Sequence, residues 1–219
     1  MVRGWRSNRL GSCVLAPAHT HKYGAKAASS SSGFFTRHII NVPVRQDPRI
    51  GEILISEEAL RVRIGQLADE ISADYAGKEV LVVGVLKGAL VFIADLVRRL
   101  TVPCTMDFMA VASYGASTHS SGVVRILKDL DATIAGKHVL VVEDVVDSGL
   151  TLSYLMKNLR SREPASLELC TLMVKPAGRR VPVEMRYVGF EMPDTFVVGY
   201  GLDFDESFRQ LPYIAAFVE

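Results

Sequence analysis

The sequence has few cysteines, and they form no recognisable pattern. Cys13, Cys104 and Cys170 are the only three cysteines in a chain of 219 residues, and they lie far apart. No Cys-x-x-Cys or Cys/His spacing indicates a zinc site, and an odd number of distant cysteines gives no disulfide framework. A reducing compartment therefore fits the cysteine content best.

The chain also lacks a strong charge of either sign and an uninterrupted apolar run. Its formal net charge of +1 gives no electrostatic argument for binding nucleic acid or an anionic membrane. The longest apolar region, residues 80–97, contains Lys87 and Asp95 and is broken by Gly84 and Gly88. It predicts a strand, a turn and a helix instead of a membrane span. We therefore expect neither a nucleic-acid partner nor a membrane partner.

Acidic residues are missing from the first part of the chain. No Asp or Glu precedes Asp47, whereas arginine and lysine recur there and serines fill residues 29–32. Such composition is typical of a mitochondrial or plastid transit peptide, and the alternative is a disordered tail or a misassigned start. We predict a leader at residues 1–45 and one domain at residues 46–219. The expected location is the cytoplasm, or a mitochondrion or plastid if the leader is a transit peptide.

Beyond residue 50, apolar strands alternate with helical segments. Ser56 precedes Glu57 and Glu58, which is typical of a capped helix start, and apolar residues then recur at helical spacing up to Gly77. Further helices are predicted at residues 89–99 and about 150–162. Strands are predicted at residues 79–85, 102–114, 123–130, 139–142, 167–174, 187–190 and 196–199. This alternation indicates an α/β fold with a mostly parallel sheet flanked by helices.

The most specific pattern follows the strand at residues 139–142. Glu143 and Asp144 come directly after it, and the small-residue turn at residues 147–151 leads into a helix. Ligands bind beyond the carboxyl ends of parallel strands, and a helix N-terminus favours a phosphate. The two carboxylates suit ribose hydroxyls or a metal ion. The pattern predicts a site for a phosphate and a sugar, although an acidic loop that only caps a helix would look similar.

The segment Glu143-Asp144-x-x-Asp147-Ser148-Gly149-x-Thr151 resembles the 5-phosphoribosyl 1-pyrophosphate (PRPP) motif of type I phosphoribosyltransferases. Residues 83–88, Ser113-Tyr114, Val174-Lys175 and residues 190–203 are similar to the hypoxanthine/guanine phosphoribosyltransferases of bacterial type. The resemblance extends over about residues 50–215. It implies the type I phosphoribosyltransferase fold, in which a mostly parallel twisted sheet flanked by helices carries a small hood subdomain and a mobile loop.

The resemblance also implies an activity. This is purine salvage, in which the phosphoribosyl group of PRPP is transferred to N9 of hypoxanthine or guanine to give IMP or GMP and pyrophosphate. The implied cofactor is Mg²⁺, the small-molecule partners are PRPP and a 6-oxopurine, and the assembly is a homodimer or homotetramer. Two alternatives remain. One is a phosphoribosyltransferase for xanthine or another base. The other is a non-catalytic, PRPP-sensing regulator that binds RNA or DNA, which the low net charge does not support.

Matched position by position, the resemblance assigns roles to individual residues. Asp147 is the implied catalytic residue, a general base near N7 of the purine. The implied PRPP ribose-phosphate contacts are Glu143, Asp144, Asp147, Ser148, Gly149, Leu150 and Thr151. The implied pyrophosphate contacts are Leu86, Lys87, Gly88 and Arg209, with a cis peptide bond between Leu86 and Lys87. The implied purine contacts are Lys175, Phe196, Val197 and Asp203. Ser113 and Tyr114 open the mobile loop, and the implied metal carboxylates are Glu143, Asp144 and Asp203.

Some of these residues have a simpler structural explanation, and two depart from the family pattern. Lys175 could be a surface lysine at a strand end, Phe196 a core residue and Asp203 part of a solvated turn. Some animal members carry a basic residue at the position of Leu150, whereas bacterial-type members often carry leucine there. Ser148 stands where others have threonine and keeps the hydroxyl group.

Overall fold

The computed structural model describes residues 47–114 and 123–218. The predicted leader at residues 1–45 and the predicted mobile loop beyond Tyr114 lie outside these residues. Within the described ranges, no helix is both long enough and apolar enough to cross a membrane.

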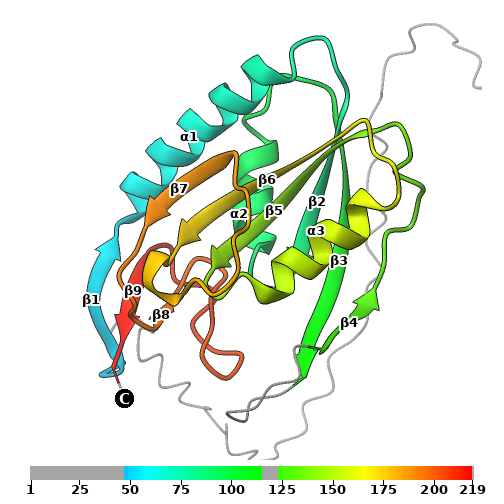
Figure 1. Ribbon diagram of the computed structural model, residues 1–219. Helices are drawn as coiled ribbons and strands as arrows, with labels where there is room; N and C mark the ends of the chain where they lie inside the picture. Colours follow the sequence, from blue (N-terminus) through cyan, green and yellow to red (C-terminus); the bar gives the residue numbers. More distant parts are fainter. Residues whose placement is uncertain (1–46, 115–122, 219) are drawn as a thin grey trace, which may run out of the picture. The chain divides into compact units, whose positions relative to one another are not determined.

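The larger of the two sheets in the described chain has six strands (Figure 1), in the order β4-β3-β2-β5-β6-β7. Its strands are β2 (Val80–Leu86), β3 (Cys104–Tyr114), β4 (Val123–Lys128), β5 (His138–Val146), β6 (Ser166–Val174) and β7 (Tyr187–Glu191). All neighbours pair in parallel except β3 and β4, which are antiparallel. The predicted mostly parallel sheet is confirmed.

Three helices cover the two faces of this sheet. α1 (Glu57–Asp74) begins at the predicted cap, where the Ser56 side chain accepts a hydrogen bond from the Ala59 amide. α1 and α2 (Leu90–Val97) share one hydrophobic core with alternate strand residues such as Val82. α3 (Leu150–Arg160) shares the other core with their neighbours, such as Val83. Successive residues of a strand point to opposite sides of the sheet. Because strands such as β2 are apolar along their whole length, both faces of the sheet are apolar.

A second, three-stranded antiparallel sheet has the order β1-β9-β8. It consists of β1 (Ile50–Ile55), β9 (Ile214–Phe217) and β8 (Val197–Val198). We call this sheet and the loop at residues 199–213 the hood, the small subdomain that the resemblance implied. β1 and β9 were not predicted, and β8 is shorter than the predicted strand at residues 196–199.

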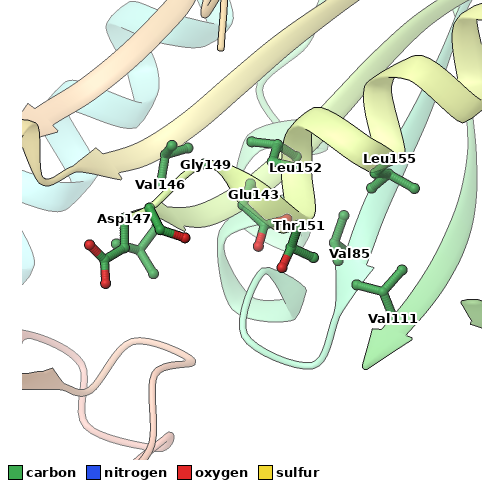
Figure 2. Close-up of a pocket in the computed structure, with 11 residues that line it drawn as sticks. Val85, Val111, Glu143, Val146, Asp147, Gly149, Thr151, Leu152 and Leu155 are labelled. Carbon is green, nitrogen blue, oxygen red and sulfur yellow. The ribbon is translucent and has the colours of Figure 1, made fainter. Parts of the chain in front are cut away.

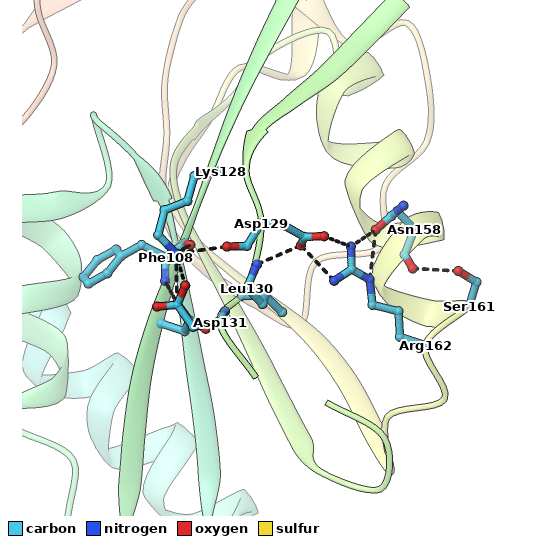
Figure 3. Close-up of polar contacts among 9 residues, drawn as sticks. Phe108, Lys128, Asp129, Leu130, Asp131, Asn158, Ser161 and Arg162 are labelled. Atoms are coloured by element: carbon cyan, nitrogen blue, oxygen red, sulfur yellow. Dashed lines mark hydrogen bonds and ion pairs between the residues drawn. The ribbon is translucent and has the colours of Figure 1, made fainter. Parts of the chain in front are cut away.

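A polar network fixes the base of the β3–β4 hairpin (Figure 3). The Lys128 ammonium lies 3.4 Å from an Asp107 carboxylate oxygen and 3.2 Å from one of Asp131. Next to it, Asp129 accepts two hydrogen bonds from Arg162, at 2.8 and 2.9 Å. Arg162 also donates to the Asn158 side chain on α3. The network therefore ties the end of β4 to the C-terminal end of α3.

Candidate active site

β5 continues past its predicted end, so the acid pair, Glu143 and Asp144, lies inside the strand and not after it. The strand persists because its parallel pairing with β6 continues to the register Val146↔Val174. Adjacent strand residues point to opposite faces. Glu143 accordingly lines a cavity on the α3 side, whereas the Asp144 carboxylate approaches Gly88 at the start of α2.

The turn after β5, residues 147–151, is shaped by Gly149. This residue is the N-cap of α3 and has a φ of 76°, in the left-handed region that favours glycine. An added Cβ would also come within 2.7 Å of the Val181 carbonyl oxygen. Gly149 has no side chain to accept hydrogen bonds from the first helical turn, so that turn presents backbone N–H groups to an anion.

A cavity of about 210 Å³ opens between the end of β5 and the start of α3 (Figure 2). Five of the predicted PRPP contacts line it, namely Glu143, Asp147, Ser148, Gly149 and Thr151. Leu150 does not line it, and 37% of that residue is exposed. In Figure 2 the Asp147 carboxylate points away from Glu143 and Thr151. It lies against Gly178, where an added Cβ would collide with an Asp147 oxygen.

The surroundings of the acid pair only partly offset a negative charge on its carboxylates. Glu143 Oε2 is buried and has no hydrogen-bond partner among the described residues. Burial raises the pKa of Glu143 well above its ordinary value, and the charge of Asp144 adds to this. Burial also raises the pKa of Asp144, against the effect of a 2.7 Å hydrogen bond from the Val145 amide. Ligand hydroxyl groups or a cation would satisfy these carboxylates.

We expect Glu143→Gln to stabilise the ligand-free protein at pH 8 by about 1–3 kcal/mol, because glutamine removes a buried charge whose desolvation costs at least this much. The folded state holds the Glu143 proton more tightly than the unfolded chain, because the pKa is raised. The contribution of Glu143 to the stability of the wild type is therefore fully present below the ordinary pKa of glutamate. It is lost as the pH rises through the raised pKa of the folded state. Glutamine does not titrate. Urea unfolding should therefore show that the variant exceeds the wild type in free energy of unfolding at pH 8, and that this difference shrinks towards pH 4.

The exposed Glu184 provides the matched control for this measurement. Glu184→Gln removes the same charge without removing a buried carboxylate, so its stability should follow the wild-type pH dependence. Equal pH dependence of the Glu143→Gln variant and the wild type would contradict the electrostatic role of the acid pair.

The loop at residues 86–88, which is predicted to contact pyrophosphate and which we call the pyrophosphate loop, lies between the acid pair and the hood. The peptide bond between Leu86 and Lys87 is cis, as the resemblance implied. An added Cβ at Gly88 would collide with the Asp144 carboxylate, and one at Gly201 would collide with the Gly88 carbonyl oxygen. Both positions therefore require glycine, because backbone and side chains from three separate segments meet here.

The two cations predicted to contact pyrophosphate, Lys87 and Arg209, both lie beside this loop and the hood. Arg209 donates to the Gly201 carbonyl at 2.7 Å and pairs with the Asp203 carboxylate at 2.8 Å. The Lys87 ammonium lies 3.0 Å from a carboxylate oxygen of Glu206. No motif in the sequence singles out Glu206, because its contact with Lys87 spans 119 positions of the chain.

The residues predicted to contact the purine come from the end of β6 and from the hood. The Lys175 amide donates to the Val146 carbonyl at 2.9 Å, which places Lys175 next to the end of β5. Val197 lies in β8, paired with Ala216. Phe196 is 53% exposed and is therefore not a core residue. Its ring meets those of Phe204 and Phe217 edge-on, at centroid distances of 6.0 and 5.8 Å, which leaves a face of the ring available for stacking.

The structure does not gather Glu143, Asp144 and Asp203 into one set of metal ligands. Within residues 47–114 and 123–218, no three His, Cys, Asp or Glu side chains are placed to hold a metal ion. Asp203 instead pairs with Arg209 and accepts a hydrogen bond from the Glu206 amide at 2.9 Å. The acid pair does fit Mg²⁺ that takes most of its ligands from phosphate and water, because Glu143 Oε2 has no partner in the part of the chain that the structure describes.

Ser113 and Tyr114 are the last residues of β3, where Tyr114 is opposite Val123 of β4. The remainder of the predicted mobile loop lies outside the described residues. Apart from this loop, the predicted site residues gather around the carboxyl ends of β2, β5 and β6 and the facing hood.

Comparison with known proteins identifies the family to which this fold belongs. Residues 51–205 match the phosphoribosyl transferase domain family. The chain is 54% identical over 171 residues to the hypoxanthine-guanine phosphoribosyltransferase of Mycobacterium tuberculosis H37Rv, covering 75% of this chain and 85% of that one. It is 50% identical over 165 residues to that of Bacillus subtilis, covering 75% and 92%.

A solved structure shows the same fold. The crystal structure of a Bacillus anthracis hypoxanthine-guanine phosphoribosyltransferase superposes with a TM-score of 0.74 at 47% identity, covering 77% of this chain and 99% of that one. The resemblance found in the sequence and the type I phosphoribosyltransferase fold are both confirmed. The chain therefore belongs to the phosphoribosyltransferase family, within its hypoxanthine-guanine phosphoribosyltransferase branch.

Proposed function

We propose that this protein transfers the 5-phosphoribosyl group of PRPP to N9 of hypoxanthine or guanine, giving IMP or GMP and pyrophosphate. The observation that carries this proposal is the meeting of the acid pair, the phosphate turn at residues 147–151 and the pyrophosphate loop at one end of the sheet. Family membership and the names of the relatives support it.

PRPP would bind across this end of the sheet. The N-terminal turn of α3 and the hydroxyl groups of Ser148 and Thr151 would hold the 5′-phosphate. Glu143 and Asp144 would accept hydrogen bonds from the ribose hydroxyls, which would satisfy the unpartnered Glu143 oxygen. Lys87 and Arg209 would face the pyrophosphate. This arrangement positions the donor without a protein nucleophile.

Transfer would begin with loosening of the bond between C1′ and the pyrophosphate oxygen, which makes C1′ electron-deficient. The cations beside the pyrophosphate stabilise the charge that develops on the leaving group. Asp147 would take the proton that the purine loses as N9 bonds to C1′. When bound, Mg²⁺ supplies positive charge to the phosphate oxygens, with the acid pair as its candidate protein ligands.

The base would lie between Lys175 and the exposed face of Phe196. The Lys175 ammonium would donate to the exocyclic O6 of a 6-oxopurine, and the Val197 backbone would bond the base edge. Xanthine also carries an oxygen at this position, so Lys175 does not by itself reject xanthine. A panel of hypoxanthine, guanine, xanthine and pyrimidine bases would establish the preferred acceptor.

We expect Lys175→Gln to raise KM for hypoxanthine by about 10- to 100-fold, the usual effect of losing a hydrogen bond to a charged group. KM for PRPP should change much less, because Lys175 would contact the base and not the donor. Steady-state kinetics with each substrate varied in turn would measure this difference. Lys157→Gln, on the exposed side of α3, is the matched control. Equal increases in both KM values would contradict a role in base recognition.

The direct test of the function is the formation of IMP from hypoxanthine, PRPP and Mg²⁺ by the purified protein. Phosphoribosyl transfer should depend on all three components and release one pyrophosphate per IMP. A protein that binds PRPP but forms no nucleotide from any base would instead support the alternative of a PRPP-sensing regulator.

We also propose the bounds of the catalytic domain, its assembly and its location in the cell. Residues 46–219 form the phosphoribosyltransferase domain, and residues 1–45 form a leader. The enzyme acts as a homodimer or homotetramer in the cytoplasm, or in a mitochondrion or plastid if the leader is a transit peptide. Mass spectrometry of the protein isolated from its native source would show whether the leader is removed. Analytical ultracentrifugation of the purified protein would give its oligomeric state.

A further inference from the structure

A loop of the hood places a carboxylate between the two cations predicted to contact pyrophosphate. One oxygen of Glu206 lies 3.0 Å from the Lys87 ammonium, and the other lies 3.5 Å from the Arg209 guanidinium. Lys87 comes from the pyrophosphate loop, and Arg209 lies three residues after Glu206 in the hood loop. The Glu206 carboxylate therefore pairs with the same two cations, Lys87 and Arg209, that an anionic ligand would use.

The loop holds Glu206 in an unusual backbone conformation. Asp205 and Glu206 have φ values of 48° and 59°, in the left-handed region, and neither is glycine. They are the central residues of a tight turn closed by two hydrogen bonds between Phe204 and Ser207, at 3.1 and 3.0 Å. Two positive φ values in such a turn normally select Asn and Gly. Backbone strain of this kind clusters at functional sites.

A further hydrogen bond fixes the direction of the turn. The Glu206 amide donates to Asp203 at 2.9 Å, and Asp203 is itself paired with Arg209 at 2.8 Å. The backbone of Glu206 and its carboxylate are thus both connected to Arg209. The network fixes the backbone of the turn at Glu206, from which the carboxylate reaches Lys87 and Arg209.

We propose that Glu206 acts as an internal competitor for the pyrophosphate site, occupying Lys87 and Arg209 until PRPP or pyrophosphate displaces it. This inference rests on the proposed function, since it takes the two cations as pyrophosphate contacts. The side chains of Lys87 and Glu206 are 66% and 65% exposed, so their ion pair is weak and a ligand with several negative charges displaces it readily. Glu206 therefore weakens binding of the donor and favours release of the pyrophosphate product.

The test is the affinity for inorganic pyrophosphate, measured by calorimetry in buffer containing Mg²⁺, for the wild type and for Glu206→Gln. Glutamine keeps the size of the side chain and removes the charge that competes. We expect pyrophosphate to bind about three- to fivefold more tightly, consistent with the weakness of exposed ion pairs. KM for PRPP should fall by a similar factor, while KM for hypoxanthine stays unchanged.

Asp205→Asn is the matched control, because it removes one negative charge from the neighbouring position of the same turn. No contact of the Asp205 carboxylate with Lys87 or Arg209 occurs in the described part of the chain, and its pyrophosphate affinity should stay at the wild-type value. An equal gain in Asp205→Asn would show a general charge effect and overturn the inference. Unchanged or weaker pyrophosphate binding by Glu206→Gln would overturn it as well.

The outcomes separate this inference from the proposed function. If the wild type binds pyrophosphate and forms IMP while Glu206→Gln behaves like the wild type, only the role of Glu206 is wrong. If the wild type forms no nucleotide and binds no pyrophosphate, the proposed function itself is wrong. In a Lys87→Met background, Glu206→Gln should give a smaller gain than in the wild type, because one of the two competing contacts is already absent.

Discussion

Replacing Asp147 with asparagine should lower kcat by about 10²-fold or more, the range expected for loss of a general base. Asp147 follows β5 and is exposed, and its carboxylate rests against Gly178, which has no side chain to displace it. An asparagine amide has nearly the same shape but cannot accept the purine proton. KM for PRPP should change far less than kcat. Rapid-quench measurement of IMP formation in a single turnover would isolate the chemical step.

Asp69→Asn, on the exposed side of α1, is the control for the Asp147 variant. It removes an aspartate charge far from the site and should leave kcat unchanged. Thermal unfolding of both variants should match the wild type, because neither position is buried. A near-wild-type kcat for Asp147→Asn would remove this residue from the chemical step and direct attention to solvent as the proton acceptor.

Gly88→Ala should lower kcat/KM for PRPP by about 10²-fold or more. The added methyl group cannot be accommodated beside the Asp144 carboxylate, so the pyrophosphate loop or the acid pair must move. Both belong to the proposed donor site, and small displacements of reacting groups reduce rates by this order. The free energy of unfolding should fall by only about 1–3 kcal/mol, as overpacking usually does. Steady-state kinetics and urea unfolding would measure the two effects separately.

Gly65→Ala is the matched control, since an added Cβ there meets nothing within 4 Å. Gly65 lies inside α1, where alanine is more stable than glycine by up to about 1 kcal/mol. This variant should keep full activity and unfold at slightly higher urea concentration. Full activity of Gly88→Ala as well would mean that the loop adjusts without disturbing the donor site.

The sequence predicts best what depends on local patterns. α1 begins at the predicted cap because Ser56 and the acidic first turn act within a few residues of one another. The parallel sheet follows from the alternation of strands and helices, and the phosphate turn follows from its small residues. β5 ran past its predicted end because a strand continues as long as its neighbour pairs with it, even through charged residues.

What the sequence could not predict depends on contacts between distant segments. β1 and β9 are short and pair with an irregular register, so neither has a periodic pattern of its own. The contact between Lys87 and Glu206 likewise joins segments that are brought together only by the fold. The resemblance named Asp203 as a metal carboxylate, but its pairing with Arg209 is visible only in three dimensions.

The pairing of β1 with β9 has a consequence for the order in which the protein forms. β1 contributes the first described strand and β9 the last, and β8 joins the small sheet only through β9. The strands of the larger sheet can pair while the chain is still being synthesised, since β2 to β7 all precede residue 192. The hood is different, because β1 has no partner in its sheet until residues 214–217 have emerged from the ribosome. A nascent chain can thus assemble the half of the site that would hold the ribose and phosphate before the half that would hold the purine.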